Sequence, residues 1–438
     1  MYHDSAGLEI TSQSAEAVAA YDRSVASLLE YRLDAGQHAK SALKAQPDFP
    51  MGLCFRGYAL MQLGTNQVHG KVDQTLQQAK SVSAGTTCRE QHHISALEYW
   101  MNGHVRAACR EWEQILVTSP ADLLALRLHH FMSFWQGHRS RLRDVPAAVV
   151  GAIDESTPGY GFALGMFAFG LEECGDYARA EEFGRRAVSV NGDDLWAVHA
   201  VAHVLEMQSR HREGTQWLDQ DLGVWQDRNP FRDHIWWHTA LFSLELGDFA
   251  RVLELYDRQI CVDEGGFYLD LQNAASLLMR LQLLNIDVGE RWTEVADLAE
   301  TRIDDHHLPF TDIHFMLALT GDRRLPAARK FVRSLEAFAE TGGNDAAQIT
   351  AAIGLPLARG LLAFAQECYG AVVDCLLELR HDMAGLGGSH AQQDIFTLLL
   401  IEAAIRDGRK TLARSLLAER CELRPGNEAA RRQFALTS

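Results

Sequence analysis

The chain has 438 residues, of which 47% are hydrophobic and 23% are charged, as in an ordinary soluble globular protein. This length exceeds one compact core of ordinary size, so we expect several domains or an elongated repeat. The formal net charge of −17 argues against sequence-independent binding to nucleic acid and against anionic membranes, because both need basic surface. We therefore expect neither a nucleic-acid partner nor a membrane partner.

The N-terminal segment MYHDSAGLEI lacks the basic and apolar regions of a signal peptide, and no apolar run is long enough to span a bilayer. The eight cysteines are scattered and none forms a CxxC pair. Most of them stand among apolar helical residues, where a reduced cysteine behaves as a small hydrophobe. We expect a reducing, cytoplasmic setting and no zinc site made of thiolates.

Apolar residues recur at spacings of three and four almost throughout, which predicts a nearly all-helical fold. Residues 160–194 contain an apolar helix, a Gly-Asp-Tyr turn, a second helix and an Asn-Gly-Asp break. This order resembles a tetratricopeptide repeat, a helical hairpin. Comparable turns recur at Gly64, Gly103, Gly137, Gly175, Ser209, Gly247, Gly321 and Gly408, with two more near Asn285 and Glu367. The pattern predicts an all-α, tetratricopeptide-like right-handed superhelix of about eleven hairpins, as one continuous α-solenoid domain over residues 1–438.

Two of these apolar helices each carry a pair of histidines four residues apart. The pairs are His199 with His203 and His234 with His238, and Glu206 follows His203 by three residues. Side chains three and four apart share one face of a helix. Four imidazoles and a carboxylate are costly to bury without partners. We therefore expect these five residues to face an internal groove and to carry any catalysis.

Several segments have sequence features that are more specific than those of a generic repeat. AVHAVAHVLEM (197–207), HIWWHTALFSLELGDF (234–249), DVGERW (287–292) and GSHAQQDIF (388–396) resemble the tetratricopeptide repeat protein 38 family. The likeness extends over roughly Val25 to Arg424. The resemblance implies a fold but no settled reaction. Asn273 stands where the family pattern leads us to expect an acid, so the ligand or activity differs here if that position matters.

In repeats of this type the first helix of each hairpin lines the concave surface, chiefly through the second, fifth, ninth and twelfth residues of the unit. Those places are taken here by Trp196, His199, His203, Glu206, His234, Trp237, His93, Glu172 and Arg127. A peptide-binding solenoid tends to show Asn, Lys and Arg there. A lining of His, Trp, Glu and Arg suits a small polar ligand, a metal or proton transfer.

A divalent metal is one cofactor that this lining allows. His199, His203 and Glu206 offer two nitrogens and an oxygen from one helix face, and His234 or His238 offers a third nitrogen. The sequence HAVAHVLE is not the HExxH motif, because Ala200 occupies the place of the glutamate. The order is also the reverse of the Glu-x-x-His of di-iron bundles. Whether a cofactor is present stays open at this point.

Acid–base catalysis without a metal needs a histidine poised by a carboxylate. Glu206, Glu172 and Asp270 are candidates for that carboxylate, and His390 with Asp394, four residues apart, forms a further candidate pair. His314 is another inward-facing histidine. The alternative is that such histidines are packing residues at helix crossings, which is the favoured interpretation of His314.

The favoured function is a pocket that binds a small polar ligand, with acid–base or metal-assisted chemistry as an extension. The alternative is a scaffold that binds a protein or peptide without catalysis. A scaffold predicts an open groove that tolerates His203→Ala, whereas an enzyme predicts an enclosed pocket with perturbed histidine pKa values. The sequence leaves open whether the protein is an enzyme.

Overall fold

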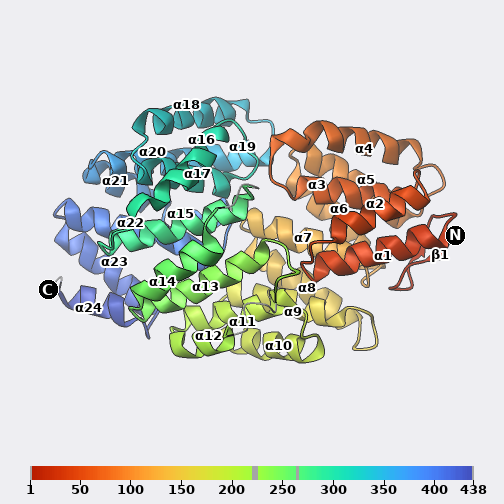
Figure 1. Ribbon diagram of the computed structural model, residues 1–438, viewed down its shortest axis with the longest axis horizontal. Coiled ribbons are helices and arrows are strands. Elements are labelled where there is room, and N and C mark those ends of the chain that lie inside the picture. Colours follow the sequence, from red (N-terminus) through yellow and green to blue (C-terminus); the bar gives the residue numbers. More distant parts are fainter. Residues whose placement is uncertain (1, 220–224, 263–265, 437–438) are drawn as a thin grey trace. The chain divides into compact units, whose positions relative to one another are not determined.

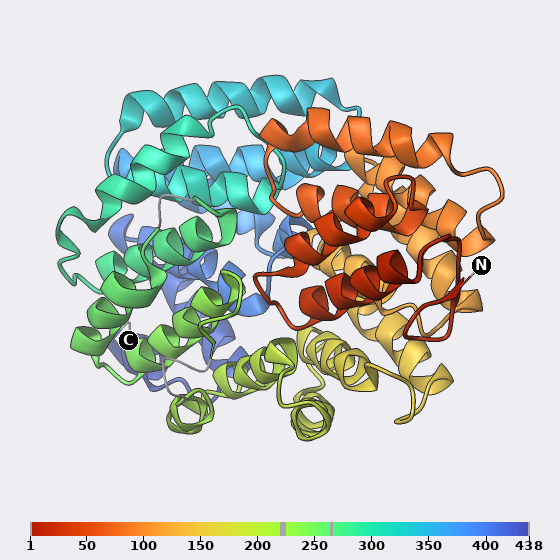
Figure 2. The same cartoon turned by 45° about the vertical axis from the view of Figure 1, so that its right-hand side comes forward.

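The computed structural model describes residues 2–219, 225–262 and 266–436 (Figures 1 and 2). Within these ranges nearly all regular structure is helical. The named strands are β1 (Tyr2–His3) and β2 (Glu9–Ile10), which pair antiparallel with Tyr2 opposite Ile10. The prediction of an all-α fold is confirmed.

The helices follow one another as antiparallel pairs, which gives eleven consecutive hairpins in the described part of the chain. The pairs are α1 (Ala15–Leu29) with α2 (Ala35–Ala45), α3 (Pro50–Met61) with α4 (His69–Ser81), α5 (Cys88–Met101) with α6 (Val105–Thr118), α7 (Leu123–Trp135) with α8 (Arg139–Ala152), α9 (Tyr160–Glu173) with α10 (Tyr177–Val190), α11 (Leu195–Met207) with α12 (His211–Trp217), α13 (Phe231–Glu245) with α14 (Phe249–Leu255), α15 (Tyr268–Leu283) with α16 (Trp292–Thr301), α17 (Pro309–Gly321) with α18 (Leu325–Thr341), α20 (Leu355–Ala365) with α21 (Tyr369–Leu379), and α22 (His390–Arg406) with α23 (Lys410–Leu423). This tandem order is that of a tetratricopeptide-like helical repeat.

Shorter elements join or follow these pairs. They are α19 (Asp345–Ile349), α24 (Glu428–Leu436), the 3₁₀ turns η1 (Asn66–Val68), η3 (Gly289–Arg291) and η5 (Met383–Leu386), and the π-helical turns η2 (Tyr256–Ile260) and η4 (Thr350–Gly354). The stretch Asp345–Ala365, which combines α19, η4 and α20, is long and apolar enough to cross a membrane, and half of it is buried. Core helices of water-soluble proteins meet the same criterion, so the absence of a membrane partner stays a prediction.

Most predicted turns contain a residue in the left-handed region, which ends one helix and starts its partner. These residues are Gly64, Gly103, Gly137, Gly175, Ser209, Gly247, Asn285, Glu367 and Gly408. The predicted turn at Gly321 also lies between two helices, although the left-handed residue between α17 and α18 is Arg323 (φ 55°). Gly321 ends α17, where an added Cβ would lie 2.6 Å from the Trp292 ring. A small residue is needed there for packing.

By its internal contacts the chain forms two compact units. Unit 1 comprises Met1–Val201 with Leu222–Asn229, and unit 2 comprises Ala202–Asp221 with Pro230–Ser438. The division falls within α11, which runs through it as one unbroken helix. The expectation of one continuous domain stays a prediction.

Helix α15 is the central helix of unit 2. It packs against α13, α16, α17 and α22, and its residues from Tyr268 to Leu281 are all buried (Figure 1). A helix that is buried all round is normally apolar. This one nevertheless carries Asp270, Asn273 and Arg280, and each of these polar groups needs compensation inside the fold. The candidate site is built around them.

We expect Gly170→Ala to destabilise the protein strongly, because α9 touches the α8 backbone at Gly170. An added Cβ would lie 2.0 Å from the carbonyl oxygen of Leu142, and a backbone atom cannot move aside without shifting its helix. The expected loss in unfolding free energy is about 3 kcal/mol. Gly175→Ala is the control, since that glycine has φ 82° and open space around it, for an expected loss of about 1–2 kcal/mol. Urea denaturation measures both; equal losses would contradict the close α8–α9 contact.

Candidate functional site

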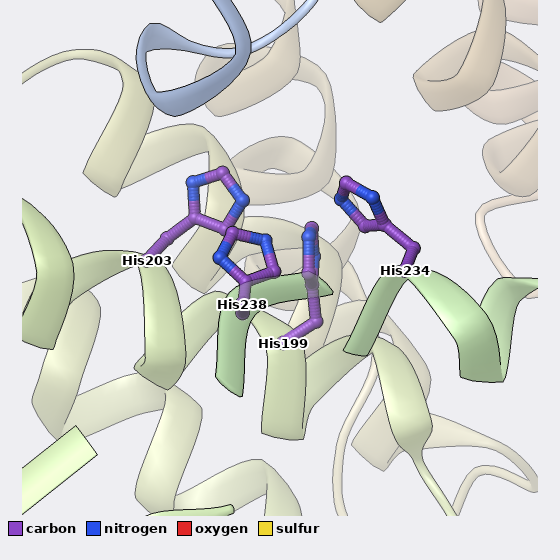
Figure 3. A group of neighbouring side chains, drawn as sticks. All are labelled: His199, His203, His234 and His238. Atoms are coloured by element: carbon purple, nitrogen blue, oxygen red, sulfur yellow. The ribbon is translucent and has the colours of Figure 1, made fainter. Parts of the chain in front are cut away.

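The candidate site of unit 2 is a cluster of buried imidazoles from α11 and α13. His203 and His238 are fully buried, and His234 is 3% exposed. One ring nitrogen from each of the three lies within 4.8 Å of the others. The ring centroids are 4.5 Å apart for His203 and His238 and 4.9 Å apart for His234 and His238 (Figure 3). The helical spacing that predicted two stripes of histidines therefore produces one group of nitrogen donors.

His199 lies one turn before His203 on the unbroken helix α11, so the helix itself places it beside His203. The side chain of His199 is buried. Its ring also stacks on Phe169 of α9, with centroids 5.5 Å apart, and packs against Trp196 at 4.8 Å. A role of His199 as a metal ligand stays a prediction.

Two of the imidazoles are oriented by hydrogen bonds through Nδ1. The Nδ1–H of His238 donates to Oε2 of Glu206 at 2.9 Å, and the Nδ1–H of His234 donates to Oδ1 of Asn273 at 2.8 Å. In a neutral imidazole the second nitrogen then carries a lone pair. Metal-binding histidines are typically held in this way, by an acceptor on the nitrogen that does not bind the metal.

The surroundings keep these two rings neutral. Burial lowers the pKa of His234 well below its usual value, and the neighbouring His238 adds to that effect. Burial also lowers the pKa of His238, with His203 and Arg280 acting in the same direction. Burial raises the pKa of Glu206, although the positive charge of Arg424 opposes this shift. Neutral imidazoles bind a metal without first having to lose a proton.

The donor set differs from the predicted one in one member. We expected Glu206 to be a metal ligand, but its carboxylate accepts the Nδ1–H of His238. His238 in turn joins His203 and His234 as a nitrogen donor. Three imidazoles suit first-row divalent cations of the zinc type better than magnesium or calcium, which prefer oxygen.

Two further predicted residues, Trp237 and Asn273, provide buried hydrogen-bond donors near the imidazoles. Trp237 is fully buried and stacks on His234, with ring centroids 5.1 Å apart. Among the described protein atoms, its indole N–H and the Nδ2 of Asn273 have no hydrogen-bond acceptor. A buried donor normally has a partner, so these two donors are suited to an acceptor on a bound molecule.

Other predicted groove residues form a separate cluster in unit 1. Arg127 donates from Nη2 to the Tyr31 hydroxyl at 2.8 Å, and its guanidinium lies 5.9 Å from the ring centroid of Trp196. The Trp196 and Tyr31 rings stack at 6.2 Å. Glu172 is buried on α9. This cluster packs aromatic rings around one arginine and offers no group of metal-type donors within itself.

His93 belongs to a structural anchor rather than to a groove. Its Nε2 hydrogen-bonds Oδ2 of Asp122 at 3.1 Å, and the same carboxylate oxygen accepts from Nη1 of Arg89 at 2.8 Å. Asp122 also caps α7 by accepting the Ala125 N–H at 2.9 Å. His93 and Arg89 hold the pKa of Asp122 well below its usual value, against the effect of burial.

The predicted pair of His390 with Asp394 is replaced by an ion pair. Arg420 on α23 binds both carboxylate oxygens of Asp394, through Nη1 to Oδ1 and through Nη2 to Oδ2 at 3.0 Å. His390 begins α22 and is half-buried. Asp270, a candidate catalytic carboxylate, is buried on α15.

His314 is a packing histidine, in keeping with the favoured interpretation. Its Nδ1–H donates to the Phe310 carbonyl at 2.8 Å, and burial lowers its pKa to about 4. Between pH 6.5 and about 4 the unfolded chain therefore binds a proton here that the folded chain does not, so acidification favours unfolding. We expect His314→Leu to weaken this acid sensitivity by about 1.4 kcal/mol per pH unit in that window. Unfolding free energies of both proteins from pH 7 to pH 4.5 measure the difference; parallel curves would contradict it.

Two of the buried charged groups that were not predicted from the sequence are Arg280 and Asp194. Arg280 stands in the apolar run LLMRLQLL of α15, and this isolated charge was the signal available for it. Asp194 is buried in unit 1 just before α11, where it caps the helix by accepting the Ala197 N–H at 3.0 Å. Burial raises the pKa of Asp194 to about 7. An aspartate before a helix predicts a cap, but its burial depends on the packing around it.

No protein-family model matches the chain. Two solved structures with helical folds are similar to it. The match to a crystal structure of the yeast Tom70 covers 96% of this chain and 97% of the Tom70 chain, with 12% identity and a TM-score of 0.35. A structure of Naa15/Naa10 bound to HypK-THB covers 92% of this chain, which spans 62% of that one, with 12% identity and a TM-score of 0.28. At these values the helix order described above carries the fold assignment.

Proposed function

We propose that unit 2 is a metal-dependent ligand-binding centre in which His203, His234 and His238 bind one divalent cation of the zinc type. The carrying observation is the three-imidazole group with two rings held through Nδ1 by Glu206 and Asn273. This combination of donors and outer acceptors is difficult to explain by packing, because a packing imidazole needs only one satisfied orientation.

The chemistry that such a centre supports is activation of water or of a ligand carbonyl. Three protein ligands leave a coordination position open, and a bound cation lowers the pKa of water placed there. The indole N–H of Trp237 and the Nδ2 of Asn273 supply donors for an acceptor on a small polar ligand. We infer that hydrolysis or hydration of such a ligand is the reaction class, and that the protein acts in the cytoplasm.

Membership of the tetratricopeptide repeat protein 38 family is a further part of the proposal. Four segments carry it, and two of them contain the histidines of the candidate site. We propose that the chain is a member of that family and that its hairpins continue as a right-handed superhelix. Tandem helical hairpins support the coarser statement of a tetratricopeptide-like repeat protein directly.

The second candidate function is a scaffold that binds a peptide or protein. The tandem hairpins favour it, because stacked helical repeats present extended surfaces to such partners. A scaffold uses exposed side chains, whereas the histidine cluster is buried. The two functions are compatible in one chain, and they predict different effects of substitutions in the cluster.

Metal titration of chelator-treated protein tests the proposal. We expect Zn²⁺ or Co²⁺ to bind with a stoichiometry of about one per chain and to raise the melting temperature, with Co²⁺ giving the absorption spectrum of nitrogen ligation. The half-exposed His38, which pairs with Asp34, provides the control variant His38→Gln. Binding that is lost in His203→Gln and kept in His38→Gln supports the centre. Binding that is equal in both variants would reject it and leave the scaffold as the better function.

We expect Asn273→Asp to increase the metal affinity. Aspartate would accept the Nδ1–H of His234 with a full negative charge, which makes the opposite ring nitrogen a better donor. The expected gain in affinity is about tenfold, measured by competition with a chromophoric chelator. Asn273→Leu removes the acceptor and is expected to weaken binding. An unchanged affinity in both variants would show that His234 does not bind the metal.

A further inference from the structure

A second feature of unit 2 is a cavity to whose lining Arg280 contributes. It has a volume of about 880 Å³ and is lined by residues of α12, α13, α14, α15, α22, α23 and α24 and of the turns that join them. Its size is in the range of sites for small organic ligands. Leu246 and Arg432 among its lining residues are exposed, so the cavity opens to solvent.

Arg280 reaches this cavity from the buried helix α15 and is itself only 4% exposed. Its guanidinium donates to the Ser276 hydroxyl, to the Ser276 carbonyl at 3.3 Å, and to the Ala391 carbonyl at 2.8 Å. It also lies 5.7 Å from the Trp237 ring centroid. All of these partners are neutral, and the described residues provide no carboxylate in an ion pair with Arg280.

Such an arginine is costly to bury, because a desolvated charge requires an opposite charge. Burial lowers the pKa of Arg280 to about 10, so it is still cationic at neutral pH. Its neutral hydrogen bonds fix the direction of the guanidinium without cancelling its charge. A guanidinium that is oriented by neutral partners and keeps its charge is expected where an arginine binds an anion that is not part of the chain.

The carboxylates around the cavity do not supply that charge, since most are already engaged. Glu213 pairs with Arg210 at 2.7 Å, and Glu402 pairs with Arg406 at 2.7 Å. Glu245 accepts from the neutral Nδ2 of Asn427 at 3.1 Å and keeps its charge, which acts on Arg420. A fourth carboxylate, that of Glu428, is exposed at the rim.

The neighbouring buried groups add positive charge. Asp394 serves two arginines, pairing with Arg420 and lying 3.6 Å from Arg424. Glu206, the other buried carboxylate in this region, is the acceptor for His238. Counting Arg280, three buried arginines thus face two carboxylates. Among these buried groups the arginines outnumber the carboxylates, so an anion at Arg280 would be favoured.

One part of the remaining wall is apolar, while other parts carry polar and charged side chains. Leu244, Leu283, Leu398 and Ile401 line the cavity and are buried or half-buried. A buried cation without an ion-pair partner beside an aliphatic patch is complementary to a ligand with an anionic head and an apolar body.

We propose that this cavity binds a small organic acid, with its carboxylate on the guanidinium of Arg280 and its hydrocarbon body against the leucine wall. The inference goes beyond the metal centre and does not depend on it, because the cavity, the arginine and the apolar wall are present whether or not the imidazoles bind a cation. Since Arg280 also faces Trp237, an acid held here would lie on the side of α15 that leads toward the histidine cluster.

Isothermal titration of the full-length protein in a chelating buffer tests this proposal without the metal. The probes are octanoate, octyl phosphate, the neutral octanamide and inorganic phosphate. We expect saturable octanoate binding and an affinity for octanamide at least tenfold lower. Comparable binding of octyl phosphate would extend the ligand class to phosphates, and weak octyl phosphate binding would restrict it to carboxylates; both results support an organic anion. Equal binding of octanoate and octanamide, or no octanoate binding, would overturn the proposal.

Substitutions locate the binding. Arg280→Gln keeps hydrogen-bonding capacity but removes the charge, and we expect octanoate to bind at least tenfold more weakly. Arg432→Gln removes an exposed positive charge at the rim and is expected to change the affinity less than twofold. If Arg280→Gln does not fold, Leu398→Trp fills the cavity from a half-buried wall position and is expected to abolish binding. Full affinity in a folded Arg280→Gln or Leu398→Trp protein would overturn the assignment.

Discussion

The His238→Gln variant is expected to lose its metal, falling from about one equivalent per chain to a level that dialysis removes. His238 is the ring at the centre of the cluster, 4.5 Å from His203 and 4.9 Å from His234 between centroids. A divalent cation of the zinc type holds three or four protein ligands in a small shell, so the loss of one donor weakens it by orders of magnitude. Metal analysis of protein purified without chelator, beside the wild type, measures the effect.

The variant Glu206→Gln distinguishes two roles of Glu206, as hydrogen-bond acceptor for His238 or as metal ligand. A glutamine oxygen still accepts the Nδ1–H of His238 but carries no charge, so we expect a 10- to 100-fold lower affinity with the stoichiometry retained. If Glu206 were a ligand itself, as the sequence predicts, Glu206→Gln would lose the metal as completely as His238→Gln. If both variants retained wild-type affinity, the buried cluster would be a packing arrangement and the proposed centre would be rejected.

Replacing Asp122 with alanine is expected to give the largest loss of stability, about 3–5 kcal/mol in the free energy of unfolding. One carboxylate there receives Arg89, His93 and the first turn of α7. Its removal leaves the buried Arg89 with Asp4, at 3.3 Å, as its remaining ion-pair partner. It also leaves a helix start without its cap, which alone costs about 1 kcal/mol.

Asp248→Ala provides the matched control for this prediction. Asp248 caps α14 by accepting the Arg251 N–H at 3.1 Å, but it is exposed and joins no buried ion pair. We expect a loss near 1 kcal/mol for this variant. Chemical denaturation of both variants gives the comparison. Similar losses for the two aspartates would mean that the buried ion pairs of Asp122 contribute little beyond the cap.

The helices and most of their turns could be predicted because they depend on neighbours in the chain. Apolar spacings of three and four determine which segments are helical, and a glycine or asparagine after such a segment adopts the left-handed conformation that ends it. Gly175 and Asn285 were found in this way. Gly321 was also found in this way as the end of α17, but its need for a small residue comes from Trp292 of another helix, and no local pattern contains that contact.

The candidate site could likewise be predicted in part, as far as it depends on residues that are close in the chain. The spacing of His199 with His203 and of His234 with His238 placed each pair on one helix face from the sequence alone. That His203, His234 and His238 form one group of donors was decided by the packing of α11 against α13 within unit 2. The role of Glu206 changed from ligand to acceptor for the same reason, because its oxygen meets the Nδ1–H of a residue on another helix.

The sequence by itself therefore determined the tandem all-α hairpins, their helix faces and the residue types available for chemistry. Only the tertiary structure decided which charges are paired, as Asp122 and Asp394 are, and which are left to a ligand, as Arg280 is. The physical reason is range. Helix periodicity and capping act over a few residues, whereas ion pairing and desolvation depend on side chains that are brought together from distant parts of the chain.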